Sequence, residues 1–162
     1  MDTLSVDARH GHRRWWALAG FAAAVVVAAG IGGLGVSGTA QEYGGLARPS
    51  WAPPSSVFGP VWTVLYAMIA LAGWLVWRRV GFGPALYVWT AQLVLNALWT
   101  PIFFGAGRYG LAFLDIVVLW ALVGATVALF WRVSRPAALL LVPYWAWVTF
   151  AAALNLAVWR MN

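Results

Sequence analysis

The polar side chains inside the apolar segments are the residues of this sequence that could do chemistry. Gln92 and Asn96 lie four residues apart and are followed by Trp99 at helical spacing, so one helix face carries all three. Asp115 is the one acid within an apolar segment. A polar group in hydrocarbon is costly and needs a partner or a function. For Gln92, Asn96 and Asn155, two interpretations stay open: hydrogen bonds that join helices, or contacts with a ligand.

Two further segments carry aromatic and small residues at the same helical spacing. The first stripe consists of Trp62, Tyr66, Ile69 and Gly73, and the second of Tyr144, Trp147, Ala151 and Asn155. These stripes should point inward, because Leu, Val and Ala suffice on the sides that face lipid. Together they predict an aromatic-lined, weakly polar cavity, which suits a flat apolar ligand with a few polar groups.

Most catalytic and metal-binding patterns are absent from the sequence. It has no cysteine and no HExxH, phosphate-loop or Ser/His/Asp arrangement, so no metal site is expected. His10 and His12 lie in an arginine-rich N-terminal stretch. For Asp115, a structural role such as capping a neighbouring helix or pairing with Arg108 is favoured over a proton relay.

The composition identifies the solvent of the chain. Of 162 residues, 64% are hydrophobic and 9% are charged, whereas soluble domains average about 25% charged residues. The arginines stand at the ends of apolar runs instead of clustering on one polar face, which argues against nucleic-acid binding. The partner predicted by this pattern is the lipid bilayer.

Five apolar segments divide the chain. They cover about residues 15–36, 57–77, 84–104, 109–131 and 136–159, and each is long enough to cross a hydrocarbon core of about 30 Å. The sequence therefore predicts an all-α integral membrane protein, a bundle of five transmembrane helices in one domain, 15–160, after a basic tail, 1–14. Short joints predict that helices two to five are antiparallel and adjacent. Only the first connection, about 37–56, is long.

The N-terminal segment resembles a secretory signal, because arginines precede an apolar run and "SGTAQ" follows it. The run is longer than the usual apolar stretch of about 7–15 residues, which favours a retained helix. Small residues recur every four positions within it and predict a ridge that another helix can approach closely. The ridge consists of Gly20, Ala24, Ala28 and Gly32.

The arginines also predict an orientation. Seven fall on the side of the N-terminus, namely Arg9, Arg13, Arg14, Arg78, Arg79, Arg132 and Arg135, and three fall on the other side, namely Arg48, Arg108 and Arg160. Cytoplasmic loops carry the excess of basic residues. In a bacterial inner membrane, the N-terminus would be cytoplasmic, and the 37–56 loop and the C-terminus would be external.

Four motifs occur in order along the chain: "RPSWAPP", "GPVWTVLY", "QLVLNALWTPIFFG" and "PYWAWVTFAAALN". With them, residues 43–160 closely resemble the tryptophan-rich sensory protein and translocator protein family. The resemblance implies a five-helix, commonly dimeric membrane protein that requires no cofactor. It implies a pocket for porphyrins such as protoporphyrin IX and for synthetic benzodiazepine-type and isoquinoline ligands, beneath a lid formed by the long first loop.

The same resemblance assigns residues to the pocket. It implies ligand contacts for Tyr43, Trp51, Trp62, Asn96, Trp147 and Ala151, to which the inward stripe adds Tyr66. Trp62 and Trp147 match the pair linked, in some bacterial relatives, to light-dependent porphyrin breakdown. Gln92, Asp115 and Asn155 are expected to be structural polar residues.

Three functions remain open at this point. The first is tetrapyrrole binding for sensing, regulation or clearance under stress, the second is photochemical porphyrin degradation, and the third is transport of tetrapyrroles or other hydrophobic small molecules. Animal members of the family bind cholesterol and carry a tyrosine after "LN" near the C-terminus. In this chain "LNLAVWR" has Leu156 there, which lowers the expectation of a sterol site.

Overall fold

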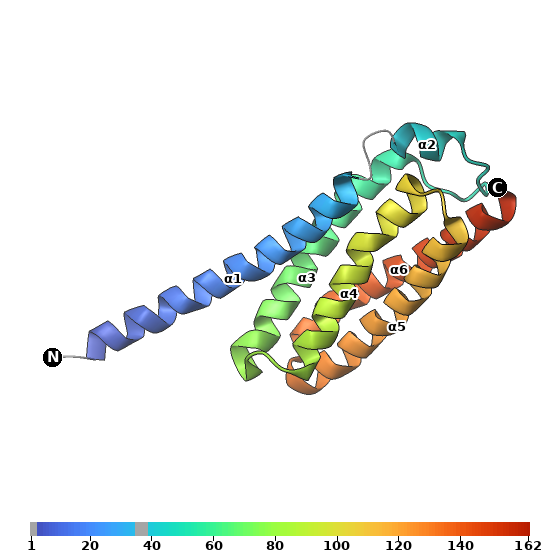
Figure 1. Cartoon of the computed structure of the whole chain (residues 1–162). Helices are drawn as coiled ribbons and strands as arrows, with labels where there is room; N and C mark the ends of the chain where they lie inside the picture. Colours follow the sequence, from blue (N-terminus) through green and yellow to red (C-terminus); the bar gives the residue numbers. More distant parts are fainter. Residues whose placement is uncertain (1–2, 35–38) are drawn as a thin grey trace.

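The computed structural model describes the backbone of residues 3–34 and 39–162 and the side chains of residues 15–33 and 42–162. Every regular element in these ranges is helical (Figure 1). In chain order the elements are α1 (Thr3–Leu34), α2 (Thr39–Gly45), η1 (Ser55–Val57), α3 (Phe58–Val80), α4 (Pro84–Thr100), η2 (Pro101–Gly105), α5 (Tyr109–Val133) and α6 (Arg135–Met161).

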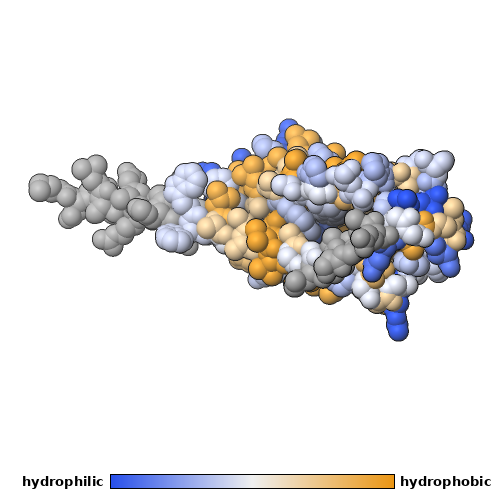
Figure 2. All heavy atoms as spheres, turned by 90° about the horizontal axis from the view of Figure 1, so that it is seen from above, coloured by the Kyte–Doolittle hydropathy of each residue, from blue (hydrophilic) through white to orange (hydrophobic). Residues whose placement is uncertain are grey.

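Four stretches are long and apolar enough to cross a membrane: Trp15–Gly33, Ser55–Val80, Tyr109–Val133 and Arg135–Met161. Large apolar side chains such as Val26, Val94 and Leu114 lie on the outside of the bundle. Hydrophobic residues occupy much of the middle of the face in Figure 2, and strongly hydrophilic ones gather at the end with α2 and the C-terminus. The prediction of an all-α membrane protein is confirmed for the described residues.

The element bounds differ from the predicted segments at the N-terminal side. Helix α1 begins at Thr3, so it includes residues 3–14 of the predicted basic tail. The long connection, 37–56, holds helix α2 and part of the 3₁₀ turn η1. Residues 35–38 lie outside the described part. The ends of α2 and α6 lie together at one end of the bundle, opposite the α3–α4 and α5–α6 turns (Figure 1).

The predicted adjacency of helices two to five is wrong for α3 and α4. Their backbones approach each other at few positions, although only residues 81–83 join them, and α1 packs against both. The ring of Phe21 from α1 meets the Trp89 ring of α4 edge-on, with centroids 5.3 Å apart, and it also lies against Gly73 of α3. A short turn fixes which helix ends meet, but it does not prevent a third helix from wedging between the two.

The predicted ridge on α1 is correct for only half of its length. Ala28 and Gly32 are buried, whereas Gly20 and Ala24 are exposed. The buried face of α1 consists of Phe21, Val25, Ala28 and Gly32. A helix has about 3.6 residues per turn, so a stripe with strict four-residue spacing drifts around the helix, while alternating steps of four and three stay on one side.

We call the 37–56 connection the lid segment, or lid. At the opposite end of the bundle, specific hydrogen bonds hold the helix ends together. Gly81 follows α3 with φ of 68°, a left-handed conformation that suits glycine, and its N–H donates to the Trp77 carbonyl at 2.9 Å. Arg79 Nη1 donates to the Val133 carbonyl at 2.7 Å. This bond satisfies a free carbonyl at the end of α5 and ties α3 to the α5–α6 turn.

A substitution at Gly73 tests whether α1 packs between α3 and α4. A methyl group there would lie 2.9 Å from both Phe21 Cδ1 and Trp89 Cε2, so Gly73→Ala should destabilise the protein by about 1–3 kcal/mol through overpacking. The matched control is Gly20→Ala, where nothing lies within 4 Å of the added methyl. Thermal melting in detergent should show a lower Tm for Gly73→Ala alone. Equal Tm values for the two variants would contradict this packing.

Candidate functional site

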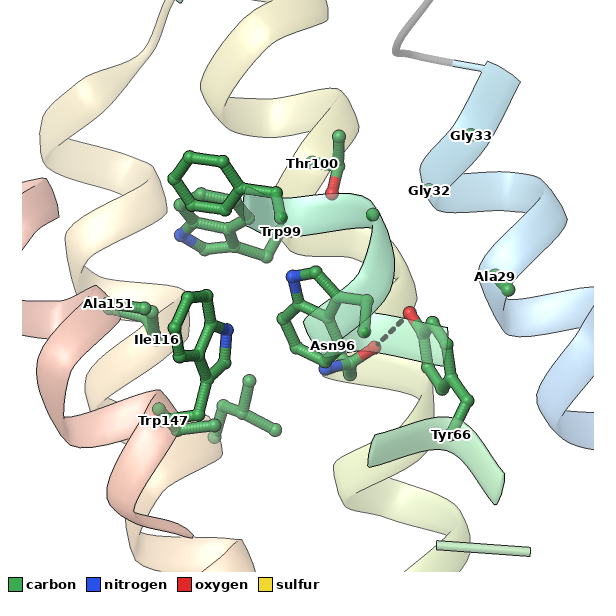
Figure 3. Close-up of a pocket in the computed structure, with 15 residues that line it drawn as sticks. Ala29, Gly32, Gly33, Tyr66, Asn96, Trp99, Thr100, Ile116, Trp147 and Ala151 are labelled. Atoms are coloured by element: carbon green, nitrogen blue, oxygen red, sulfur yellow. Dashed lines mark hydrogen bonds between the residues drawn. The ribbon is translucent and has the colours of Figure 1, made fainter. Parts of the chain in front are cut away.

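All five long helices border a cavity near the lid. Its inner chamber has a volume of about 270 Å³. Helix α1 contributes only small residues there, Ala29, Gly32 and Gly33, whereas deeper in the bundle its buried face carries Phe21 and Val25. The space between α3 and α4 is therefore filled at one level and open at the next. Figure 3 shows side chains from α4 and α6 converging on this opening, with the backbone of α1 at its far side.

The cavity continues toward the lid as a second chamber of about 350 Å³. The two chambers share the lining residues Phe58, Gly59, Trp62, Trp99, Thr100 and Ala151. Tyr43 and Ser55, from the lid segment, line the second chamber but not the inner one. The inner chamber and the second chamber therefore share walls and adjoin each other, between the middle of the bundle and its lid end.

Aromatic rings form the walls of both chambers. The rings of Trp62 and Tyr66 lie 5.2 Å apart between centroids, and Trp99 stacks on Phe103 at 4.9 Å. Phe58 meets Trp147 edge-on at 5.9 Å. No acid or base lines either chamber among the described residues. These walls offer flat apolar contact and no acid–base pair.

A chain of side-chain hydrogen bonds runs along the base of the inner chamber. Tyr66 donates to Asn96 Oδ1 at 2.8 Å, as Figure 3 shows. Asn96 Nδ2 donates to the Tyr144 hydroxyl at 3.1 Å, which donates to Gln92 Oε1 at 2.7 Å. The chain joins α3, α4 and α6. Asn96 borders the cavity as well, so it joins helices through hydrogen bonds and also lies where a bound ligand would contact it.

Among the described side chains, three buried polar atoms lack a hydrogen-bond partner: Gln92 Nε2, Asp115 Oδ2 and Trp147 Nε1. The expected pairing of Asp115 with Arg108 is not formed among the described residues, and Arg108 is exposed. Trp147 lines the inner chamber. Since buried polar groups are normally hydrogen-bonded, its free N–H can serve an acceptor on a ligand.

Asn155 connects three helices at the second chamber. Its Oδ1 accepts a hydrogen bond from Trp99 Nε1 at 3.0 Å, and its Nδ2 donates to the Tyr109 carbonyl at 2.9 Å. The side chain borders the chamber, but its amide oxygen and its amide nitrogen are both hydrogen-bonded within the protein. It holds the Trp99 ring against the cavity.

The lid segment is fixed at several points. Tyr43 is buried, and its hydroxyl donates to the Pro53 carbonyl at 3.0 Å, which joins the two ends of the lid. Asn162 accepts from the Ala47 N–H at 3.1 Å and donates to the Ala47 carbonyl at 3.0 Å, so α6 holds the middle of the lid. Trp51 does not line the chambers. Its ring is 50% exposed and contacts Phe150.

The sequence reasoning missed several lining residues. Phe58 precedes Trp62 by four positions and so lies on the same helix face, a signal that would have placed it in the site. Ile116 and Leu119 of α5 also line the inner chamber. Nothing in an apolar helix distinguishes such residues from those that face lipid, because both are aliphatic.

The sequence of this chain is similar to those of known membrane proteins. A model described as the TspO/MBR family matches residues 21–160. The chain is 40% identical to the translocator protein of Homo sapiens over 154 residues, covering 91% of each chain. It is 41% identical over 122 residues to the tryptophan-rich sensory protein of Cereibacter sphaeroides, with 75% of this chain and 77% of the relative covered. Protein CrtK of Rhodobacter capsulatus is also 41% identical, over 124 residues, with 74% and 78% covered. The chain belongs to the TspO/MBR family.

Proposed function

We propose that this membrane protein binds porphyrins of the protoporphyrin IX type in the cavity beneath the lid, and that it acts in tetrapyrrole sensing, regulation or clearance under stress. The observation that carries the proposal is the pair of adjoining chambers that share Trp62 and Trp99 as walls, with Trp147 lining the inner one. Small-molecule pockets span about 300–1,000 Å³ and combine apolar walls with a few polar groups. The second chamber, of about 350 Å³, falls within this range, and the inner chamber, of about 270 Å³, adjoins it.

The chemistry of the walls favours a flat ring. Aromatic side chains stack on or meet planar ligands edge-on, with about 0.5–1.5 kcal/mol per pair beyond the area buried. The polar atoms at the base, from Asn96 and Trp147, are few and lie where α4 and α6 face each other. A macrocycle with a largely apolar face and nitrogen atoms at its centre matches such a site better than a sugar or a peptide.

We further propose that the chain crosses the membrane five times. Helix α4 has 17 residues, which at about 1.5 Å per residue is short for a core of about 30 Å. The π-helical turn η2 extends it directly to Gly105, so α4 and η2 together form the fifth crossing. For a bacterial inner membrane, the arginines near the α3–α4 and α5–α6 turns support an orientation with that end and the N-terminus in the cytoplasm and the lid outside.

Porphyrin titration with a blocked cavity tests the proposal. Ala151 lines both chambers, so Ala151→Leu should fill the junction between them and weaken binding about tenfold or more, given the cost of overpacking. Ala146→Leu, on the exposed side of α6, is the matched control and should bind as the unaltered protein does. The Soret band followed during titration with protoporphyrin IX in darkness gives each Kd. Unchanged affinity in Ala151→Leu, or no binding by the unaltered protein, would refute the proposed site.

Photochemical degradation of the bound porphyrin is a second candidate function. Trp62 and Trp147 border the same inner chamber from α3 and α6, so a ligand there contacts two oxidisable indoles. Phe at either position keeps an apolar ring and removes the indole.

If indole photochemistry operates, Trp62→Phe and Trp147→Phe should still bind porphyrin, yet light-dependent bleaching should fall to the rate of free porphyrin in detergent. Trp16→Phe, with a side chain 76% exposed, should bleach like the unaltered protein. The measurement is Soret absorbance over time under illumination at saturating protein. Identical bleaching in all samples, including the protein-free control, would eliminate this second function.

A further inference from the structure

A third chamber, polar and largely open to solvent, lies in the lid segment. Its volume is about 660 Å³, and its lining comes entirely from the lid segment: Tyr43, Gly44, Leu46, Arg48, Pro49, Ser50, Ala52, Pro53, Pro54 and Ser55. Tyr43 and Ser55 also line the aromatic second chamber. The aromatic second chamber therefore adjoins the polar one, and a ligand that reaches both must itself be apolar at one end and polar at the other.

Arg48 sets the charge of this polar chamber. Among the described residues that line the three chambers, it is the single charged side chain. The guanidinium carbon lies 4.4 Å from the centroid of the Tyr43 ring. No carboxylate of the described chain pairs with it, and Glu42, close in sequence, is exposed. This cation–π contact with Tyr43 does not use the guanidinium N–H groups as hydrogen-bond donors, so they stay available.

The Tyr43 ring, which contacts Arg48, is itself held by several contacts. Tyr43 is 4% exposed, its hydroxyl is held by the Pro53 carbonyl, and its ring meets Phe58 edge-on at 5.4 Å. Phe58 lines both aromatic chambers. The position of the cation is thus fixed relative to the walls that would hold a planar ring.

We propose that Arg48 binds a carboxylate of an amphiphilic ligand whose apolar ring occupies the aromatic chambers, and that this contact fixes the ligand's orientation with its acidic edge toward the lid. The inference rests on the proposed porphyrin site and adds to it the residue that recognises the carboxylate and so sets the orientation of the ligand. Arginine pairs with carboxylates through two parallel hydrogen bonds, which gives both affinity and direction. Two other arginines near this end, Arg108 and Arg160, are exposed and line none of the three chambers.

The test compares protoporphyrin IX with its dimethyl ester, which has the same ring and no charge. The unaltered protein in detergent should bind the acid about tenfold to a hundredfold more tightly than the ester, the range for a hydrogen bond to a charged group. Arg48→Gln should lose this preference and keep its affinity for the ester. Arg48→Lys keeps the charge but loses the two-bond geometry, so it should retain part of the preference. Arg108→Gln is the control and should behave like the unaltered protein.

Ionic strength supplies a second readout. The affinity of the unaltered protein for the acid should fall as salt is added, because screening weakens an ion pair that solvent can reach, and the affinity of Arg48→Gln should not. Equal affinity of the unaltered protein for acid and ester, or an unchanged preference in Arg48→Gln, would overturn the assignment of Arg48. Equal loss of acid and ester in Arg48→Gln would also overturn it, since Arg48 would then only support the lid. Failure of the unaltered protein to bind either ligand would refute the porphyrin site itself.

Discussion

The separation of α3 from α4 is the constraint on which the cavity depends. Consecutive antiparallel helices joined by three residues would ordinarily pack together, and no room would remain between them. In this chain α1 enters the gap, with Phe21 filling it beside Gly73 and Trp89. Nearer the lid, α1 offers only small residues such as Gly32. Phe21 keeps α3 and α4 apart at one level of the bundle, and the small residues of α1 leave the space between them empty at the next level. The change in side-chain size along α1 therefore creates the site.

The hydrogen-bond chain from Tyr66 to Gln92 then holds the opened helices in register. In a lipid environment a backbone or side-chain polar group finds no water, so a group left unpaired is costly. Tyr144, which is fully buried, accepts from Asn96 and donates to Gln92, and it thereby links α6 to α4. Trp147, one turn along α6, keeps a free N–H at the cavity. The same helix thus supplies both the structural bond and the unsatisfied donor.

Helical spacing was enough to predict the inward stripes, because period and polarity are local properties of the sequence. It placed Trp62 and Trp147 on faces that the structure brings to one cavity. It could not predict that α1 lies between α3 and α4, since the order of helices around a bundle depends on packing between distant segments. The aromatic lid residues show the same limit. Tyr43 lines the cavity, whereas Trp51 contacts Phe150 outside it, and only the folded path of the lid separates the two.

A structure of the protein determined with protoporphyrin IX would test the central claim most directly. The account predicts a macrocycle in the aromatic chambers, in contact with Trp62, Trp99 and Trp147 beneath a closed lid. A groove on the outer face of α5 and α6, lined by residues that include Phe113 and Trp120, offers an alternative place for a planar ligand. Density for the porphyrin in that outer groove, with the aromatic chambers empty, would contradict the account.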